Sequence, residues 1–283
     1  MADNAILADA DYADPKRQAM HEYYERGDEA DRLTTSPQGR LEFERTCEIL
    51  LRALPPAPAV VADIGGGPGR YALWLAELGY RVVHRDIVPL HVEQLRQAAG
   101  SSSAIESDLG DARNLDLADS SADAVLLLGP LYHLERKQDR LTALREAGRV
   151  VRSEGPVFGA AISRWAARLD AVLRTRFYEP HPDVLEMVDA LEGTGVLQPL
   201  YPGSFCAMTH RPDELREEVQ AAGLEVADLV CVEGAAFLLN DLEDRMADER
   251  DWRIVLEAAR AHERVPELMG IGPHLLVTAH RPE

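Results

Sequence analysis

Between residues 59 and 162, short apolar runs alternate with amphipathic stretches, and this alternation constrains the fold more than any other feature of the chain. AVVADI is a continuous apolar run of strand length, and YRVVHRD, ADAVLLLG and PVFGAAI follow it along the chain. Between the first two runs, RYALWLAELG has the pattern of a helix that ends at Gly79. Apolar strands that alternate with helices are typical of a parallel sheet covered on both faces. The segment therefore predicts a doubly wound α/β sheet.

The whole chain divides into five predicted parts around this sheet. Residues 1–15 are polar and are expected to be a flexible N-terminus, and residues 16–58 carry two helical patterns that predict a helical cap. Residues 59–162 are the predicted core. Residues 163–208 break the strand–helix rhythm with a helical, aromatic-rich stretch, which we interpret as a lid inserted over the sheet. Residues 209–283 resume the rhythm and predict the remaining part of the core.

Composition and charge exclude several classes of partner. The chain has a formal net charge of −19 and a pI of about 4.9. Such a chain repels phosphate backbones and anionic membranes, so neither nucleic acid nor a membrane is an expected partner. The apolar runs are too short to span a bilayer, and the acidic N-terminus lacks the pattern of a signal peptide. Three isolated cysteines, Cys47, Cys206 and Cys231, fit neither a disulfide framework nor a zinc site, which predicts a cytoplasmic protein.

A glycine-rich loop within ADIGGGPGRYA joins the first predicted strand to the next helix. Glycines there let the backbone take positive φ and let a ligand approach without an intervening Cβ. Because ligands bind at the carboxyl ends of the strands in open α/β sheets, the loop predicts a ligand at that edge. The spacing Gly67-x-Gly69-x-x-Ala72 formally fits a dinucleotide fingerprint, whereas Gly65-x-Gly67 leads to Arg70 and does not. The loop alone therefore does not identify the ligand.

Three acidic residues stand at or next to successive strand ends. Asp63 precedes the loop, where it can fix the loop and accept from a ligand amine. Asp86 ends the second predicted strand, and a carboxylate there accepts the hydroxyls of a ribose. Asp111 follows the third strand, where the exocyclic amine of an adenine could donate to it. Together the three carboxylates indicate a nucleoside-containing ligand more specifically than the loop does.

These features resemble the class I S-adenosylmethionine-dependent methyltransferases, and the resemblance rests on VVADIGGGPGRYALWLAELG, Asp86, GDARNL and DAVLLLGPLYHL. It implies a seven-stranded, mostly parallel Rossmann-like sheet with N-terminal helices and a helical lid insertion. The alternating HLLVTAH would be its antiparallel closing strand. It also implies S-adenosylmethionine as cofactor and S-adenosylhomocysteine as product. The residues that would bind the cofactor are Tyr24, Arg32, Asp63, Gly65, Gly66, Gly67, Gly69, Asp86, Ile87, Asp111, Ala112, Leu128 and Gly129.

Histidine and aromatic residues predict the acceptor side of the site. GPLYHL resembles small-molecule methyltransferases of bacterial secondary metabolism and would place His133 beside the transferred methyl group. The candidate catalytic residues are His133, His210 and Tyr24. The candidate substrate-binding residues are Tyr23, Tyr132, His133, Phe177, Tyr178, Tyr201, Phe205 and His210. An apolar, aromatic lid predicts a small, flat acceptor such as an indole or a phenol, with methylation at carbon, nitrogen or oxygen left open.

Two other functions stay open at the level of the sequence. A nicotinamide-dependent oxidoreductase could use the fingerprint that ends at Ala72, although the chain has only two lysines, Lys16 and Lys137, for the catalytic pair of such enzymes. A non-catalytic cofactor-binding or scaffold protein would also keep the loop and the acids. No metal-ligand set stands out, so no metal is expected. The first helices could close the site of their own chain or pack on a second copy, which leaves a homodimer open.

Overall fold

The computed structural model describes residues 20, 22–199 and 204–282, and its centre is one twisted sheet. Five parallel strands are β1 (Val60–Ile64), β2 (Arg81–Asp86), β3 (Ile105–Leu109), β4 (Ala124–Leu127) and β5 (Pro156–Ser163). Two further strands, β8 (Glu225–Cys231) and β9 (His274–His280), complete a main sheet in the order β3-β2-β1-β4-β5-β9-β8. β9 runs antiparallel to both of its neighbours. The predicted Rossmann-like sheet and its antiparallel closing strand HLLVTAH are confirmed.

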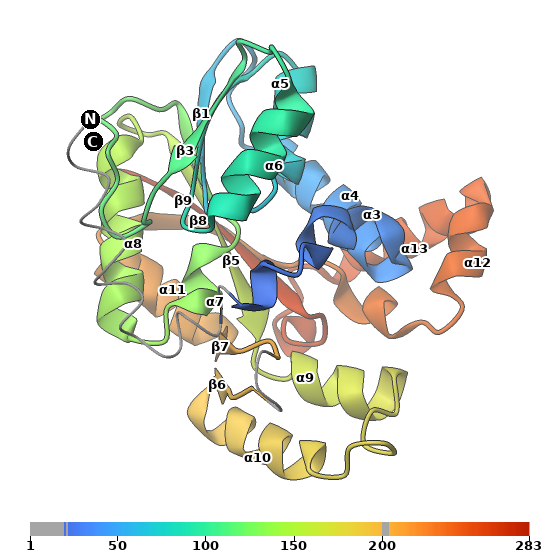
Figure 1. The fold of residues 1–283 in the computed structure, drawn as a ribbon. Coiled ribbons are helices and arrows are strands. Elements are labelled where there is room, and N and C mark those ends of the chain that lie inside the picture. The colour runs from blue at the N-terminus through green and yellow to red at the C-terminus, as the bar shows by residue number, and fades with distance from the viewer. Residues whose placement is uncertain (1–19, 21, 200–203, 283) are drawn as a thin grey trace.

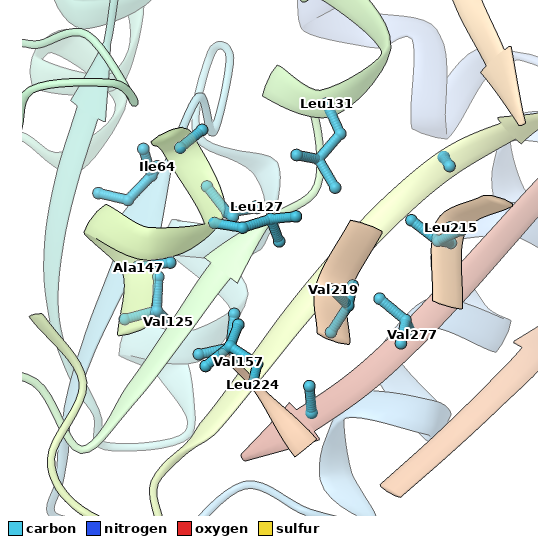
Figure 2. Packing of buried hydrophobic residues seen from close by; sticks show 14 of the residues in the cluster. Ile64, Val125, Leu127, Leu131, Ala147, Val157, Leu215, Val219, Leu224 and Val277 are labelled. Carbon is cyan, nitrogen blue, oxygen red and sulfur yellow. The ribbon is translucent and has the colours of Figure 1, made fainter. Parts of the chain in front are cut away.

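Helices cover both faces of this sheet, as Figure 1 shows. α4 (Pro37–Leu51), α5 (Arg70–Glu77) and α6 (Pro89–Ala99) pack on one face, and α8 (Lys137–Val150) and α11 (Pro212–Ala221) pack on the other. Successive strand residues alternate between the two cores, because side chains of a strand point to opposite faces. Val125 and Leu127 face the α8 side, which Figure 2 shows, and Leu126 faces the α5 side.

The N-terminal segment differs from the single helix that its pattern predicts. Residues 22–24 are helical, but Gly27 has φ +80° and ends that turn before η1 (Asp28–Asp31) and α3 (Arg32–Thr35) begin. Ser36 then caps α4, where its hydroxyl accepts from the backbone N–H of Gly39. The break at Gly27 folds the segment back, so that residues before and after it both face the carboxyl edge of the sheet. The predicted flexible N-terminus, residues 1–15, lies outside the described part of the chain.

The described residues of the 164–206 segment, 164–199 and 204–206, follow the end of β5. The segment contains α9 (Ala166–Arg168), the π-helical η2 (Leu169–Arg174), α10 (Val184–Thr194) and β6 (Val196–Leu197), and it leads into β7 (Ala207–His210). β7 pairs with the last two residues of β5, so these two short strands add to the seven predicted ones. Figure 1 shows α9 and α10 at the end of the sheet to which β5 points.

The C-terminal part adds helices beside α4. They are η3 (Gly234–Leu238), α12 (Leu242–Ala247), α13 (Glu249–His262) and η4 (Pro266–Leu268). Elsewhere in the chain, the short helix α7 (Pro130–His133) follows β4. Leu41 of α4 packs with residues of α12 and α13 in a separate apolar cluster. In the part of the chain that the structure describes, no helix is both long and apolar enough to cross a membrane.

Substitution of Gly69 by alanine is expected to destabilise the fold by about 2 to 4 kcal/mol. Gly69 caps α5 with φ +85°, and a Cβ on it would lie 2.3 Å from the Cδ1 atom of buried Leu95. Gly223→Ala is the control, since Gly223 has φ +90° but no described atom would lie within 4 Å of its Cβ. That control should lose only the stability that the backbone strain of alanine costs, about 1 to 2 kcal/mol. Equal losses in urea-induced unfolding would exclude the close packing of Gly69 as the cause.

Candidate active site

A cleft opens at the carboxyl ends of β1 to β4, and Met20, Tyr24, Glu29, Arg32 and Leu33 of the N-terminal segment also line it. The space inside it, with the solvent at its mouth, amounts to about 1060 Å³. Thirteen of the residues that the sequence predicts for the site line it: Tyr24, Arg32, Gly65, Gly66, Gly67, Asp86, Ile87, Asp111, Ala112, Leu128, Gly129, Tyr132 and His133. The structure thus brings the predicted cofactor loop and part of the predicted acceptor site into one cleft.

The glycine loop lies tightly against the residues that follow β4. Gly65 and Gly67 have φ of +65° and +59°, which glycine adopts at no steric cost. A Cβ on Gly65 would lie 2.5 Å from Cγ of Pro130, and a Cβ on Gly129 would lie 2.7 Å from the Gly65 carbonyl oxygen. These close approaches require bare backbone on both sides. The loop backbone therefore forms a floor on which a flat or extended ligand can lie.

Asp86 is the best-anchored carboxylate of the cleft. Its Oδ2 accepts from the backbone N–H of Gly67 at 2.8 Å, and its Oδ1 accepts from the backbone N–H of Val88 at 2.8 Å and from His91 Nδ1 at 3.1 Å. Burial alone would raise the pKa of the Asp86 carboxyl, but the hydrogen bonds from His91 and from the backbone N–H of Val88, with the nearby His84, outweigh it and lower the pKa. Asp86 is therefore ionised at neutral pH and holds the loop in place.

Asp111 lies across the cleft from the loop. Its Oδ1 accepts from the backbone N–H and the Nε–H of Arg113, both at 2.9 Å, and its Oδ2 accepts from the same guanidinium. Burial raises the pKa of its carboxyl from the ordinary value. With Ala112 beside it, the carboxylate presents an acceptor next to an apolar surface. This combination suits the edge and the face of a heteroaromatic base.

Asp63 takes a different place from the one that the sequence suggests. Its side chain is fully buried beneath the loop and is not part of the cleft lining, because a Cβ on Gly66 would lie only 2.3 Å from Asp63 Oδ2. Neither carboxylate oxygen has a hydrogen-bond partner among the described residues. Burial, and then the charge of Asp86, raise the pKa of Asp63 to about 7. A ligand amine could reach it only after the loop moves.

A hydrogen bond joins the N-terminal segment to the residues after β4. The hydroxyl of Tyr24 lies 2.8 Å from Nε2 of His133, and both rings line the cleft. Burial lowers the pKa of His133 to about 4, so the imidazole is neutral at pH 7. Burial, with the nearby Tyr132, raises the pKa of Tyr24 well above its ordinary value, so the phenol keeps its proton. Tyr24 therefore donates and His133 Nε2 accepts.

Further aromatic rings surround this pair. The ring of Tyr132 is tilted against that of His133, with ring centres 4.7 Å apart, and Phe205 meets His133 edge to face at 5.8 Å. Tyr23 contacts both Tyr24, at 5.1 Å, and Phe205, at 5.5 Å. These candidate substrate residues come from three distant segments and meet as one aromatic group, which can hold a flat molecule.

The structure separates other predicted substrate residues from the cleft. His210 is fully buried and does not line the cleft, its Nε2 lies 3.2 Å from Glu218 Oε2, and Glu218 is also held by Arg140. Phe177 and Tyr178 pack on the apolar core of the 164–206 segment and do not line the cleft. Tyr201 lies outside the described residues.

Arg32 belongs to a chain of alternating charges at the back of the cleft. Its guanidinium donates to both carboxylate oxygens of Glu42, at 2.6 and 3.0 Å, and to Glu29 at 2.8 Å. Nδ1 of His274 lies 3.8 Å from Glu42 and 2.5 Å from Glu233. Burial alone would lower the pKa of His274, but the two carboxylates outweigh it and raise the pKa to about 9.

Oxygen and nitrogen atoms of Glu42, Glu233 and His274 lie within 4.8 Å of one another, a spacing compatible with a metal ion. The sequence analysis did not bring these residues together. A protonated imidazole and the guanidinium of Arg32 already neutralise both carboxylates, which favours an ion network over a metal centre. The network fixes Arg32 with its face toward the cleft.

This network makes stability depend on pH in a predictable direction. The folded pKa of His274 lies near 9, above the ordinary value of 6.5, so its contribution is complete below pH 6.5 and is lost as the pH rises through 9. We expect a loss on the order of 3 kcal/mol in urea-induced unfolding between these pH values. His274→Gln should flatten that dependence, whereas the exposed His262→Gln should keep it. The same slope in both variants would exclude His274 as its source.

The sequence analysis missed several residues of the cleft. Among them are Glu29, which holds Arg32, Tyr71 on α5, and His91 on α6. A histidine in the first turn of a helix, five residues after a strand-end carboxylate, is a signal that could have pointed to His91. Tyr71 looked like an ordinary core residue of an amphipathic helix.

Comparisons with known proteins agree with this geometry. Residues 62–159 match the family model of a methyltransferase domain. An uncharacterized methyltransferase of Mycobacterium tuberculosis is 35% identical over 102 residues, which are 36% of this chain and 39% of that protein. The chain therefore matches well under half of the length of this relative.

Two solved structures are similar in fold. A SAM-dependent methyltransferase from Methanosarcina mazei is 17% identical, with a TM-score of 0.56 over 83% of this chain and 97% of that one. Geranyl diphosphate C-methyltransferase from Streptomyces coelicolor, solved with Mg²⁺, geranyl diphosphate and S-adenosyl-L-homocysteine, is 14% identical, with a TM-score of 0.52 over 84% and 79%. Residues 62–159 are thus similar to a methyltransferase domain, and the fold around them is that of solved S-adenosylmethionine-dependent methyltransferases.

Proposed function

We propose that the protein transfers a methyl group from S-adenosylmethionine to a hydroxyl of a small aromatic molecule. One observation carries this proposal: the glycine loop, which can hold a nucleoside, and the Tyr24–His133 pair line the same cleft. The glycine loop and Asp86 line this cleft together with Tyr24, Tyr132 and His133.

The residues present fit S-adenosylmethionine. Asp86 is an ionised acceptor for the ribose, and Asp111 with Ala112 offers an acceptor and an apolar face for the adenine. The guanidinium of Arg32, held by Glu42 and Glu29, lines the cleft and can donate a hydrogen bond to the carboxylate of the methionine part. When bound, the cofactor supplies an activated methyl group, and the protein has to align the acceptor with it and exclude water.

The Tyr24–His133 pair provides a route for the proton of the acceptor. The Tyr24 oxygen donates its proton to His133 Nε2 and keeps a lone pair that can accept the acceptor hydroxyl's proton. As that hydroxyl oxygen formed its bond to the methyl carbon, the bond from this carbon to sulfur would break with its electron pair left on the sulfur. The hydroxyl proton would move to Tyr24, and the proton of Tyr24 would move to His133. The acceptor becomes a neutral methyl ether, and His133 becomes an imidazolium.

The low pKa of His133 favours a hydroxyl acceptor. A phenol has a pKa of about 10, so an imidazole with a pKa of about 4 does not deprotonate it in advance. The hydroxyl becomes strongly acidic only when its oxygen is being methylated, and at that point a weak base is sufficient. A small acceptor is also consistent with the net charge of −19, which disfavours nucleic acid.

Calorimetric titration with S-adenosylmethionine, S-adenosylhomocysteine and NADH tests the cofactor first. We expect micromolar binding of the first two and none of NADH. Transfer of radiolabelled methyl to a panel of phenols, indoles and arylamines then tests the acceptor, with phenols expected to react. Binding of NADH alone would refute the proposed function, and methylation of arylamines but not phenols would refute the acceptor.

A further inference from the structure

Asp86 has too few free hydrogen-bond acceptor positions for both hydroxyls of a ribose. Each carboxylate oxygen can accept about two hydrogen bonds. Oδ1 of Asp86 already accepts from the backbone N–H of Val88 and from His91, and Oδ2 already accepts from the backbone N–H of Gly67. One acceptor position remains, on Oδ2. A ribose presents two adjacent hydroxyls, so one of them needs a different acceptor.

His91 supplies an acceptor beside that carboxylate. Its side chain is almost completely buried yet lines the cleft, and its Nδ1 lies 3.1 Å from Asp86 Oδ1. Because the carboxylate can only accept, Nδ1 carries the proton of this hydrogen bond, and in the tautomer so fixed Nε2 has a lone pair. Nε2 has no hydrogen-bond partner among the described residues. A buried polar atom without a partner costs about 1 to 3 kcal/mol, which a ligand hydroxyl would recover.

The surroundings of His91 leave the ligand as the natural partner of Nε2. The ring of Tyr24 meets the His91 ring edge to face at 5.0 Å, but its hydroxyl is bonded to His133. The second nitrogen-containing neighbour, His84, is bonded through Nδ1 to Ser107 and through Nε2 to the carbonyl of Gly67. Neither neighbour is therefore directed at Nε2.

We propose that His91 Nε2 and Asp86 Oδ2 divide the two ribose hydroxyls of the cofactor between them, each accepting one. This inference rests on the proposed cofactor and adds a positioning and specificity-determining residue that the family resemblance does not supply. Asp86 has two tasks in this arrangement, since it accepts one hydroxyl and fixes the tautomer of His91 that accepts the other.

The test uses S-adenosylhomocysteine and its 2′-deoxy and 3′-deoxy analogues in calorimetric titration of the full-length protein. With the wild-type protein, each analogue is expected to bind about tenfold more weakly than the parent, because each hydroxyl has its own acceptor. Equal affinity for the parent and either analogue would overturn the proposal without any variant. Absence of binding by the parent compound would instead refute the proposed function, so the two failures are distinguishable.

Two substitutions at the same position then identify the acceptor. In His91→Asn the amide N–H can replace Nδ1 toward Asp86, but no atom replaces Nε2, whereas in His91→Gln the amide oxygen can take the place of Nε2. We expect H91N to lose the discrimination against one deoxy analogue while keeping it against the other, and H91Q to restore it. His262→Asn, on the exposed face of α13, is the control and should behave as wild type.

Other outcomes decide against the proposal. If H91N keeps the full discrimination against both analogues, His91 does not contact the ribose. If H91N binds all three compounds as wild type does but loses turnover, His91 acts on the acceptor molecule instead. Thermal unfolding of each variant reports whether it folds, and the wild-type comparison of the analogues stands even if H91N does not.

Discussion

Replacing Asp86 by asparagine is expected to lower the affinity for S-adenosylhomocysteine about 100-fold. The ionised carboxylate accepts a hydroxyl of the ribose with a charge-assisted hydrogen bond, which contributes about 1.5 to 3 kcal/mol. The amide of asparagine has only one acceptor oxygen, and its NH₂ group would face either the Gly67 N–H or the ligand hydroxyl. Together these losses correspond to about two orders of magnitude in the dissociation constant, which calorimetry measures directly.

Asp108→Asn is the matched control for this experiment. Asp108 belongs to β3, next to β2 in the sheet, but its carboxylate is half exposed and pairs with Arg96 outside the cleft. Its replacement should leave the affinity within about twofold, since exposed ion pairs contribute little. If D86N binds as tightly as D108N, Asp86 does not hold the cofactor and the assignment of the ribose site is wrong.

The sheet could be predicted from the sequence because its signal is local. AVVADI and ADAVLLLG are buried on both faces in the structure, as their continuous apolar character predicted. HLLVTAH could be assigned an antiparallel place only through the family resemblance, since nothing within seven residues reports the direction of a neighbour. The two short strands β6 and β7 carry no such pattern and were not predicted.

The break in the N-terminal segment at Gly27 could not be predicted from the helical sequence pattern. Residues 16–33 read as a helix with one glycine, and isolated glycines occur inside helices at modest cost. At Gly27 the chain instead takes a left-handed conformation, which turns Tyr24 and Arg32 toward the same cleft. The pattern contains the glycine but not the φ angle that it adopts.

The partners of the site residues were the least predictable part. Tyr24 and His133 are 109 residues apart and meet only because residues 22–24 and α7 lie at the same edge of the sheet. His210 stands at the end of β7, where strand-end histidines often face a ligand, but Glu218 of α11 holds it in the core. Asp63 has the right place in the sequence and lies under the loop instead of on it, because the backbone of Gly66 separates it from the cleft.

Replacing Tyr24 by phenylalanine is expected to lower kcat about 100-fold while the affinity for S-adenosylhomocysteine changes by less than about threefold. The substitution keeps the ring that contacts His91 and His133 but removes the hydroxyl that bonds to His133 Nε2. Without that hydroxyl the acceptor proton has no path to the imidazole, and a positioned proton acceptor typically contributes 10²- to 10⁴-fold. The separation of kcat from cofactor affinity distinguishes this role from a cofactor-binding one.

Tyr80→Phe provides the comparison, because it also removes one hydrogen-bonded phenol hydroxyl but does so at the opposite edge of the sheet, where Tyr80 donates to the carbonyl of Pro55. Its kcat should equal that of wild type, so a loss confined to Y24F belongs to the cleft and not to the general loss of a buried hydroxyl. A Y24F variant with full kcat would remove Tyr24 from the proton route, and the neutral His133 would then have to contact the acceptor directly. A Y24F variant whose cofactor affinity falls in parallel with kcat would assign the Tyr24 hydroxyl to the binding of the cofactor. The argument for a hydroxyl acceptor would then fail, because it depends on proton transfer through Tyr24 to the weakly basic His133.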